Sequence, residues 1–542
     1  MLPELPEELL SLIFSYLALP PATKLADIAE HRKLKRKNVE DELLMKDMKL
    51  TQQTLFNICL VSKTLYRLAW PALYRAYSTW LMGWDPMSDS YFLRTLCLNP
   101  KYGKTLRSFS NRDCGMNEEE MTILRLYDDD HFLAVDAMTM AAFQWRARNL
   151  WLKGYEGGLM FQDRLVRSLL IGMDDGIKCM ILLMCPNITE LDISLPWNLP
   201  SSYLIADLFA VITSPTPQTQ QPPIGSAYEP PSSRFVTSQL LGASWPDTPW
   251  QQPGVLEHLS EFTLRSSLST AWEPLLASVT LLPSLKTLRI YNLNEGPSQD
   301  WLAAITRRNA PHLQTLHLPE CYLEDTVLCK TIQLFPRLRT LSIDWGVMHR
   351  SFISMKKIGR AVASYTPQLM HLTLDASLCR TVDDSFDDDS RVCDTLCDSI
   401  KDMQYLEHLK VNEQAIWSSL HFQNSRDPST ESREPGPGIR HALPTRLAWL
   451  EIVSPRHLGL TCWDPYVYVD YQRWQDCDLR TLFFDESFTE LERVDIHNCT
   501  LEMCTSSVRE RGWTSEAAET ERGAKVERLI RHKTNMTMSD GT

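Results

Sequence analysis

The sequence predicts an α/β protein in which a short helical module precedes an irregular repeat that builds a curved, parallel sheet. Three observations lead to this prediction. Residues 1–80 carry amphipathic helical patterns, nine short apolar stretches recur between residues 186 and 501, and the segments between those stretches vary in length. Because 542 residues exceed what one hydrophobic core usually organises, we expect more than one structural unit.

The composition is that of an ordinary globular protein, with 44% hydrophobic and 23% charged residues. A net charge of −13 argues against a general nucleic-acid binder, since such a protein needs a basic surface. The first residues include glutamates where a secretory signal would be basic, and the longest apolar run, 177–185, is too short to span a bilayer. We therefore expect a soluble protein of the cytoplasm and/or nucleus, with neither nucleic acid nor a membrane as its partner.

The 14 cysteines lie at irregular spacings and form no CxxC pair. A structural zinc site requires closely spaced cysteines together with a second pair or clustered histidines. In a reducing compartment, isolated cysteines are mostly small, buried, apolar side chains. The sequence therefore predicts free thiols, no metal site and no cofactor.

The N-terminal helical module is predicted from two stretches of sequence. Residues 5–17 should form an amphipathic helix, because Pro6 can start a helix and glutamates suit its first turn. Residues 51–77 should give two further short helices, with Thr51 and Ser62 as candidate N-caps. Pro71 should end or kink the second of these helices, since proline lacks the N–H that the helix needs.

A charged insertion, residues 18–50, separates the two halves of this module. Most of the insertion is helix-prone, and it includes the basic run HRKLKRK at 31–37. Such a run is either a nuclear-import or acidic-partner patch, or a solvated face. We interpret the insertion as a helical excursion that leaves the three-helix core intact.

Residues 81–180 predict a helical connector that holds a candidate first repeat. Two later segments should be loops, namely 214–254, which contains nine prolines, and 424–438. Residues 505–542 are polar and predict a loose tail.

Nine stretches share the pattern apolar-x-x-apolar-x-apolar. The last two apolar residues of each are two positions apart, so in a strand they point the same way, into a core. One such unit cannot bury its own apolar side, but a stack of units can, with helices or loops on the opposite face. The triplets are Ile188/Leu191/Ile193, Leu259/Phe262/Leu264, Leu285/Leu288/Ile290, Leu313/Leu316/Leu318, Leu338/Leu341/Ile343, Leu369/Leu372/Leu374, Leu406/Leu409/Val411, Leu447/Leu450/Ile452 and Leu491/Val494/Ile496.

These stretches resemble leucine-rich repeats, and the likeness covers residues 181–504. Two copies extend to the fuller pattern L-x-x-L-x-L-x-x-N/C-x-L, with Cys321 and Cys499 at the N/C position. Prolines that suit a helix ending before the next strand precede five copies. The resemblance implies an irregular solenoid, and the remaining alternative is an unrelated α/β domain with leucine-rich strands. The five prolines that precede copies of the repeat are Pro186, Pro283, Pro311, Pro336 and Pro367.

The stretch LPEELLSLIFSYL at 5–17 resembles the start of the F-box, and LFNICLVSKTLYRLAWPALYR at 55–75 resembles its second half. The resemblance implies a three-helix module that binds the Skp adaptor and, through it, a cullin. Leu5 and Pro6 are our best candidates for direct contact. The adaptor-binding residues carried over are Leu5, Pro6, Leu9, Leu10, Ile13, Phe14, Leu17, Leu60, Val61, Ser62, Leu65 and Leu68.

Together, the two resemblances imply a substrate-recognition subunit of an SCF-type ubiquitin ligase. The chain itself would be non-catalytic, because it carries no G-x-S-x-G, H-E-x-x-H or G-x-G-x-x-G motif. Outward-facing strand residues would bind an unknown protein substrate. A ligase-independent scaffold and an enzyme with a site built from distant residues remain the alternatives. The substrate-binding candidates are Arg289, His317, Arg339 and His371.

Overall fold

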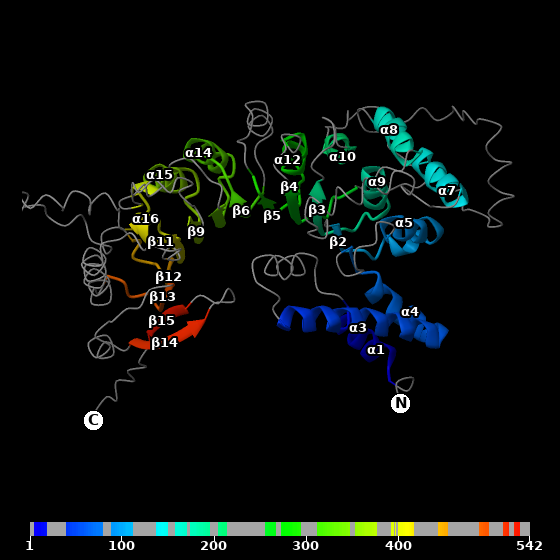
Figure 1. The fold of residues 1–542 in the computed structure, drawn as a ribbon, viewed down its shortest axis with the longest axis horizontal. Helices are drawn as coiled ribbons and strands as arrows, with labels where there is room; N and C mark the ends of the chain where they lie inside the picture. Colours follow the sequence, from blue (N-terminus) through cyan, green and yellow to red (C-terminus); the bar gives the residue numbers. More distant parts are fainter. Residues whose placement is uncertain are drawn as a thin grey trace, which may run out of the picture. The chain divides into compact units, whose positions relative to one another are not determined.

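The computed structural model is mixed α/β with a large, mostly parallel sheet, and it divides into two compact units, Met1–Leu285 and Lys286–Thr542 (Figure 1). The division falls inside the stretch expected to carry the repeats. The structure describes residues 5–18, 39–79, 88–111, 137–149, 158–170, 174–195, 204–213, 255–266, 273–293, 312–346, 353–376, 392–394, 396, 399–416, 443–453, 487–497, 513–519 and 525–531.

The first unit begins with helices and then alternates strands with helices. Its strands are ordered β1-β2-β3-β4, and each pairs with the next in parallel. Parallel neighbours require a crossover connection, and the described helices after β2 and β3 lie in two such connections. Its elements are α1 (Glu7–Tyr16), α3 (Val39–Val61), α4 (Lys63–Leu73), β1 (Ala76–Ser78), α5 (Ser88–Leu98), η2 (Pro100–Tyr102), β2 (Ser108–Asn111), α7 (Ala137–Arg148), α8 (Gly158–Leu170), α9 (Asp174–Met184), β3 (Glu190–Leu195), α10 (Leu204–Thr213), β4 (Glu261–Ser266) and α12 (Glu273–Val279).

The second unit orders its main strands β5-β6-β7-β9-β11-β12-β13-β15-β14. The pairs from β5 to β13 are parallel, whereas β13–β15 and β14–β15 are antiparallel. A separate parallel pair joins β8 and β10. The elements are β5 (Thr287–Tyr291), β6 (Thr315–Cys321), α14 (Asp325–Gln333), β7 (Thr340–Trp345), β8 (Ile353–Ser354), α15 (Met355–Tyr365), β9 (His371–Asp375), β10 (Val392–Asp394), β11 (His408–Asn412), α16 (Glu413–Ile416), β12 (Trp449–Val453), β13 (Arg493–His497), β14 (Trp513–Glu519) and β15 (Lys525–Arg531).

The nine strands predicted from the apolar pattern are all present, as β3, β4, β5, β6, β7, β9, β11, β12 and β13. Every member of the nine triplets is buried, and none is more than 3% exposed. Pairing keeps the triplets aligned, so that Leu288, Leu316, Leu341 and Leu372 occupy one row across four neighbouring strands. The side chain of Cys321, at the N/C position, is also buried.

The helical module departs from the prediction at two points. Thr51 does not start a helix, because α3 begins at Val39 and runs unbroken to Val61, with neither glycine nor proline to stop it. Residues 39–50 therefore extend the central helix of the module. The second departure is β1, which forms at Ala76–Ser78 where the sequence predicted helix; Pro71 lies inside α4, which ends two residues later at Leu73, close to the predicted end.

The prediction of a loose tail at residues 505–542 was wrong for part of that segment. Residues 513–519 and 525–531 form β14 and β15, an antiparallel pair that extends the sheet beyond β13. The buried side chains of Trp513 and Leu529 stabilise this pair. The segment is polar on average, so its composition did not indicate these two buried residues. The predicted loops 214–254 and 424–438, the basic run 31–37 and Cys499 lie outside the described residues.

Candidate functional site

The two halves of the N-terminal module meet in one core despite the insertion between them. We define the N-terminal module as α1, α3 and α4. Leu10 and Phe14 of α1 pack with Leu55 of α3 and with Leu65 and Ala69 of α4, and all five side chains are buried. The two sequence stretches that resemble the F-box therefore fold against each other.

The ends of α1 and α4 follow from local sequence. Pro6 occupies the N-cap of α1 with an extended backbone, and Glu7 and Glu8 lie in the first turn, where carboxylates interact favourably with the helix dipole. Glu7 also forms an ion pair with Arg67 of α4. Ser62 caps α4 as predicted, because its hydroxyl accepts a hydrogen bond of 3.1 Å from the backbone N–H of Leu65.

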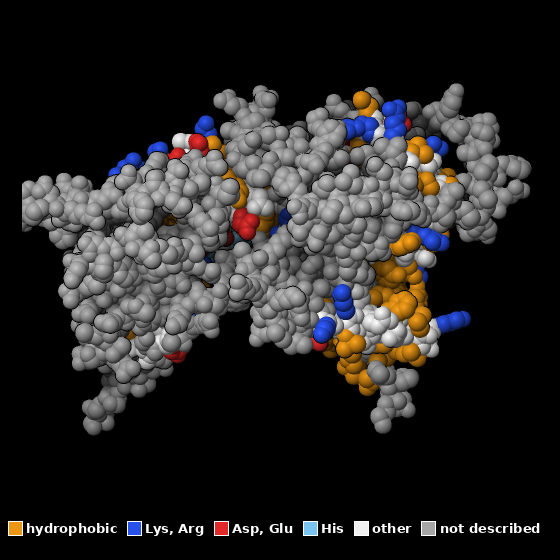
Figure 2. All heavy atoms as spheres, in the orientation of Figure 1, with side chains coloured by type: hydrophobic (Ala, Val, Ile, Leu, Met, Phe, Trp, Pro, Cys, Tyr) orange, Lys and Arg blue, Asp and Glu red, His pale blue; other side chains and the backbone are white. Residues whose placement is uncertain are grey.

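The outer side of the module carries large apolar side chains that no described residue covers. Their exposed fractions run from 38% at Leu5 to 82% at Tyr16. Figure 2 shows hydrophobic side chains gathered where Figure 1 places α1, α3 and α4. Single exposed apolar residues are ordinary, but a group of this size on one small module is typical of a protein-binding surface. We call this group the apolar face; it consists of Leu5, Leu9, Leu12, Ile13, Tyr16, Leu60 and Val61.

The predicted adaptor-binding residues divide into three groups. Seven are exposed, namely Leu5, Pro6, Leu9, Ile13, Leu60, Val61 and Ser62. Three belong to the core, namely Leu10, Phe14 and Leu65. The last two, Leu17 and Leu68, are partly buried against that core. The core members can serve a partner only by holding the module together.

Two residues of the apolar face were missed from the sequence. Leu12 and Tyr16 are 51% and 82% exposed. Leu9, Leu12 and Tyr16 lie on α1 at spacings of three and four residues, which place all three on one side of the helix, whereas Leu5 precedes the helix. That spacing could have identified Leu12 and Tyr16 from the sequence.

The second candidate surface is the outward side of the strands in the second unit. We call it the outward face. Residues that alternate with the buried leucines line up across neighbouring strands, so that one row contains His371, His408, Trp449 and Arg493. A second row contains Thr373, Lys410, Glu451, Asp495 and Arg528. Side chains from segments far apart in the sequence are thereby brought together.

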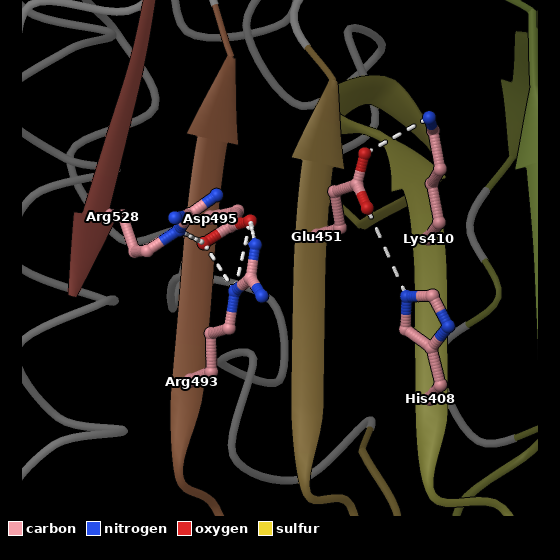
Figure 3. A network of polar contacts seen from close by, with 6 residues as sticks. All are labelled: His408, Lys410, Glu451, Arg493, Asp495 and Arg528. Atoms are coloured by element: carbon pink, nitrogen blue, oxygen red, sulfur yellow. Dashed lines mark hydrogen bonds and ion pairs between the residues drawn. The ribbon is translucent and has the colours of Figure 1, made fainter. Parts of the chain in front are cut away.

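Charged residues of the outward face pair with one another (Figure 3). The Nζ of Lys410 lies 2.9 Å from Oε1 of Glu451 on the next strand. The buried carboxylate of Asp495 accepts hydrogen bonds from the Nε of Arg493, at 2.9 Å, and from the Nε of Arg528, at 3.2 Å. The Lys410–Glu451 pair links β11 to β12, and the Arg528–Asp495 pair links β15 to β13, which favours a fixed surface over an adaptable one.

Aromatic and cationic groups stack beside these ion pairs. The rings of His408 and Trp449 are stacked with centroids 4.0 Å apart, and the guanidinium of Arg493 lies 4.1 Å from the centroid of Trp449. His371 meets His408 edge-on, with centroids 5.9 Å apart. Nε2 of His408 is buried and lies 3.8 Å from a carboxylate oxygen of Glu451, which is too long for a hydrogen bond.

Burial and neighbouring charges shift several pKa values on the outward face. Burial lowers the pKa of Lys410, but the carboxylates of Glu451, Asp375 and Asp344 outweigh it, so the net pKa is raised. Burial, together with the positive charge of Arg289, lowers the pKa of His317 to about 4. His317 is therefore neutral at physiological pH, so one of its ring nitrogens can donate a hydrogen bond and the other can accept one.

The four substrate-binding candidates do not form one cluster. Arg289 and His317 are register partners on β5 and β6. His371 lies on β9, where burial and then His408 lower its pKa against the raising effect of Glu407. Arg339 is exposed just before β7, and its backbone carbonyl accepts hydrogen bonds from the N–H groups of Met370 and His371. Their role in binding stays a prediction.

The part of the chain that the structure describes contains neither a metal centre nor a membrane-spanning helix. Within that part, no three histidine, cysteine or acidic side chains come together as metal ligands would. No helix there combines the length and apolar character required to cross a bilayer. No protein-family model matches the sequence, and no curated protein matches it significantly.

Proposed function

We propose that this protein is the substrate-recognition subunit of an SCF-type cullin–RING ubiquitin ligase. The N-terminal module acts as an F-box that binds the Skp adaptor through the apolar face. The observation that carries this proposal is the division of the motif residues into a closed core around Phe14 and an exposed apolar set that includes Leu5 and Leu9.

Binding energetics favour a macromolecular partner for the apolar face. Burying apolar side chains removes them from water at about 25 cal/mol per Å² of area, which is the dominant favourable contribution in protein association. Tyr16 contributes a large ring with a polar tip, a combination enriched at interfaces. The core of the module is small, so docking against a partner also adds to its stability.

The second part of the proposal is that leucine-rich repeats form an irregular solenoid whose outward face binds a protein substrate. The support is the recurring buried triplet at each of nine strands and their parallel pairing within each unit. Stacked repeats offer long surfaces of outward strand residues for binding. Arg289, His317, Arg339 and His371 are the proposed substrate contacts, with the cytoplasm and/or nucleus as the place of action.

The chemistry of ubiquitin transfer belongs to other subunits in this proposal. The chain contributes proximity, because it holds the substrate and the adaptor at the same time. It therefore needs no nucleophile, metal or cofactor of its own.

Titration of the purified chain with the purified Skp adaptor tests the proposal. We expect Leu5→Ala/Pro6→Ala to weaken binding by about tenfold or more, since truncation of two interface anchors typically costs more than 1 kcal/mol. Leu159→Ala/Met160→Ala is the matched control, because these two apolar side chains of α8 are also exposed but lie outside the apolar face. The control should leave the affinity unchanged.

A wild-type chain that ignores the adaptor would overturn the ligase proposal and favour a ligase-independent repeat scaffold. If the adaptor binds, affinity purification with the proteasome blocked should recover substrates that accumulate. Charge removal at Arg289 and Arg339 should then reduce their recovery.

A further inference from the structure

The N-terminal module is fastened to the rest of the first unit by an aromatic cluster that its own core does not use. We call this cluster the clasp; it consists of Tyr66 and Trp70 of α4, Tyr74 at the C-cap of that helix, and Lys101 and Tyr102 of η2. The core side chains of the module, from Leu10 to Ala69, include none of these residues. Fastening and folding therefore depend on different side chains.

Tyr102 is the centre of the clasp. Its ring stacks on Tyr74 with centroids 4.3 Å apart and planes 7° apart, and it meets Trp70 at 5.1 Å. Its hydroxyl shares a hydrogen bond with the hydroxyl of Tyr66. Aromatic pairs of this kind have preferred geometries, so they fix direction as well as distance.

Lys101 adds a charge to the same cluster. Its Nζ lies 5.7 Å from the ring centroid of Tyr66, 5.3 Å from that of Trp70 and 5.4 Å from that of Tyr102. A cation within about 6 Å of a ring face is attracted by the ring quadrupole. One ammonium thus bridges α4 and η2.

The other side of the clasp is anchored to the helix that leads into β3. Gly103 approaches α9 so closely that a Cβ at this position would lie 2.1 Å from the backbone oxygen of Met184. The carbonyl of Arg75, just after α4, accepts hydrogen bonds from the N–H groups of Arg107 and Ser108 at 2.8 Å and 3.2 Å. Only glycine fits at position 103 against α9, and a movement of η2 would break this contact between Gly103 and Met184.

We propose that the clasp is a positioning device, which holds the N-terminal module in one orientation relative to the strands of the first unit. Its functional consequence rests on the proposed function: an adaptor bound to the apolar face, and the ligase subunits it carries, would then be held in one orientation relative to the first unit. Ubiquitin transfer depends on proximity and orientation, so the clasp determines which lysines of the first unit the ligase can modify when it acts on this chain itself. The clasp residues contact neither partner and act through the orientation of α4.

The direct test measures orientation in the full chain without any partner. Spin labels attached through noncanonical residues at Ser11 of α1 and Met160 of α8 report the distance between the module and the sheet-bearing part of the first unit. We expect Tyr102→Ala to broaden this distance distribution at least twofold and Tyr102→Phe, which keeps the stacking, to restore most of its sharpness. Tyr91→Ala, an exposed aromatic of α5 outside the clasp, is the matched control and should change nothing.

The functional test uses the reconstituted ligase with ubiquitin and maps modified lysines of the chain by mass spectrometry. Tyr102→Ala should keep adaptor affinity within twofold of wild type but shift the ratios among modified lysines of the first unit at least threefold. A folded Tyr102→Ala chain with unchanged distances and an unchanged lysine pattern would overturn the inference. If this variant does not fold, Lys101→Met at an exposed position replaces it, and an unchanged distance distribution would overturn the inference equally.

The two tests separate the clasp from the proposed function. If the wild-type chain does not bind the adaptor, the proposed function fails, whereas the label distances still decide whether the clasp positions the module. If the adaptor binds and the distances are unaffected by Tyr102→Ala, only the positioning inference fails.

Discussion

The apolar face and the outward face expose different kinds of chemistry. On the apolar face, large hydrophobic side chains such as Leu9 and Tyr16 remain uncovered by any described residue. On the outward face, charged groups such as Lys410 and Asp495 already have ionic partners on neighbouring strands. A partner would gain most from desolvation at the first surface and from matching a preset pattern at the second. Binding at the apolar face is therefore expected to depend mainly on desolvation, and binding at the outward face mainly on charge complementarity.

The largest expected effect separates the core of the module from its apolar face. Phe14→Ala should destabilise the module by about 3–5 kcal/mol, because it removes a buried aromatic side chain and leaves a cavity. Leu9→Ala should change the free energy of unfolding by less than about 0.5 kcal/mol, because Leu9 is already largely exposed. Chemical denaturation followed by hydrogen exchange of α3 and α4 measures both. Equal losses of unfolding free energy for the two variants would mean that Leu9 belongs to the core of the module. That result would contradict the distinction between the core and the apolar face.

The next effect tests the neutral state of His317 on the outward face. Its pKa is lowered to about 4 by burial and by Arg289, against about 6.5 in an unfolded chain. Folding is therefore favoured above pH 6.5, and this contribution is lost as the pH falls from 6.5 through about 4, by at most about 3 kcal/mol. Amide exchange of β5–β7 should accelerate over that range, and His317→Gln should remove this part of the pH dependence. An unchanged acid profile in the variant would contradict the assignment.

Removal of the central carboxylate of the outward face should have an intermediate effect. Asp495→Ala leaves Arg493 and Arg528 without their shared acceptor, and we expect a loss of about 2 kcal/mol after allowing for the partial exposure of both arginines. The loss should be concentrated in β13–β15 and measurable by hydrogen exchange. Glu516→Ala, an exposed carboxylate opposite Arg528 on β14, is the control and should cost almost nothing. Equal losses of stability for the two variants would show that the ion pairs around Asp495 do not stabilise β13–β15.

The smallest effect concerns a motif residue that we expect to act inside the module. Ser62→Ala removes the N-cap of α4 and should cost about 1 kcal/mol, whereas Ser62→Asp should retain most of the stability, since aspartate also caps well. Adaptor affinity should remain within twofold for both variants. A large loss of affinity at unchanged stability would make Ser62 a contact residue of the apolar face.

The regular part of the fold could be predicted from the sequence because a buried strand has a simple pattern. Leu341 and Ile343, for example, are two positions apart and both fully buried, as their spacing requires. The start of α3 could not be found in this way, because good helix formers continue on both sides of Thr51. β14 was missed because its strand is largely polar and depends on pairing with β15.

The candidate site was predictable to a smaller degree. The motif identified Leu5 and Leu9, but it did not separate exposed residues from core residues such as Phe14, since both kinds are apolar. Contacts such as the one between Arg528 and Asp495 depend on the register of antiparallel strands far apart in the chain. A single sequence carries no local pattern that fixes such a register.

The most direct test of the central claim is a calorimetric titration of the full chain with purified Skp adaptor. We predict one-to-one binding with a dissociation constant of about 1 μM or tighter, corresponding to roughly −8 kcal/mol. Leu9→Asp/Ile13→Asp should abolish it, because two charges would be buried without partners at the interface. Absence of binding by the folded wild-type chain at about 100 μM adaptor, or equal binding by the double variant, would contradict the account.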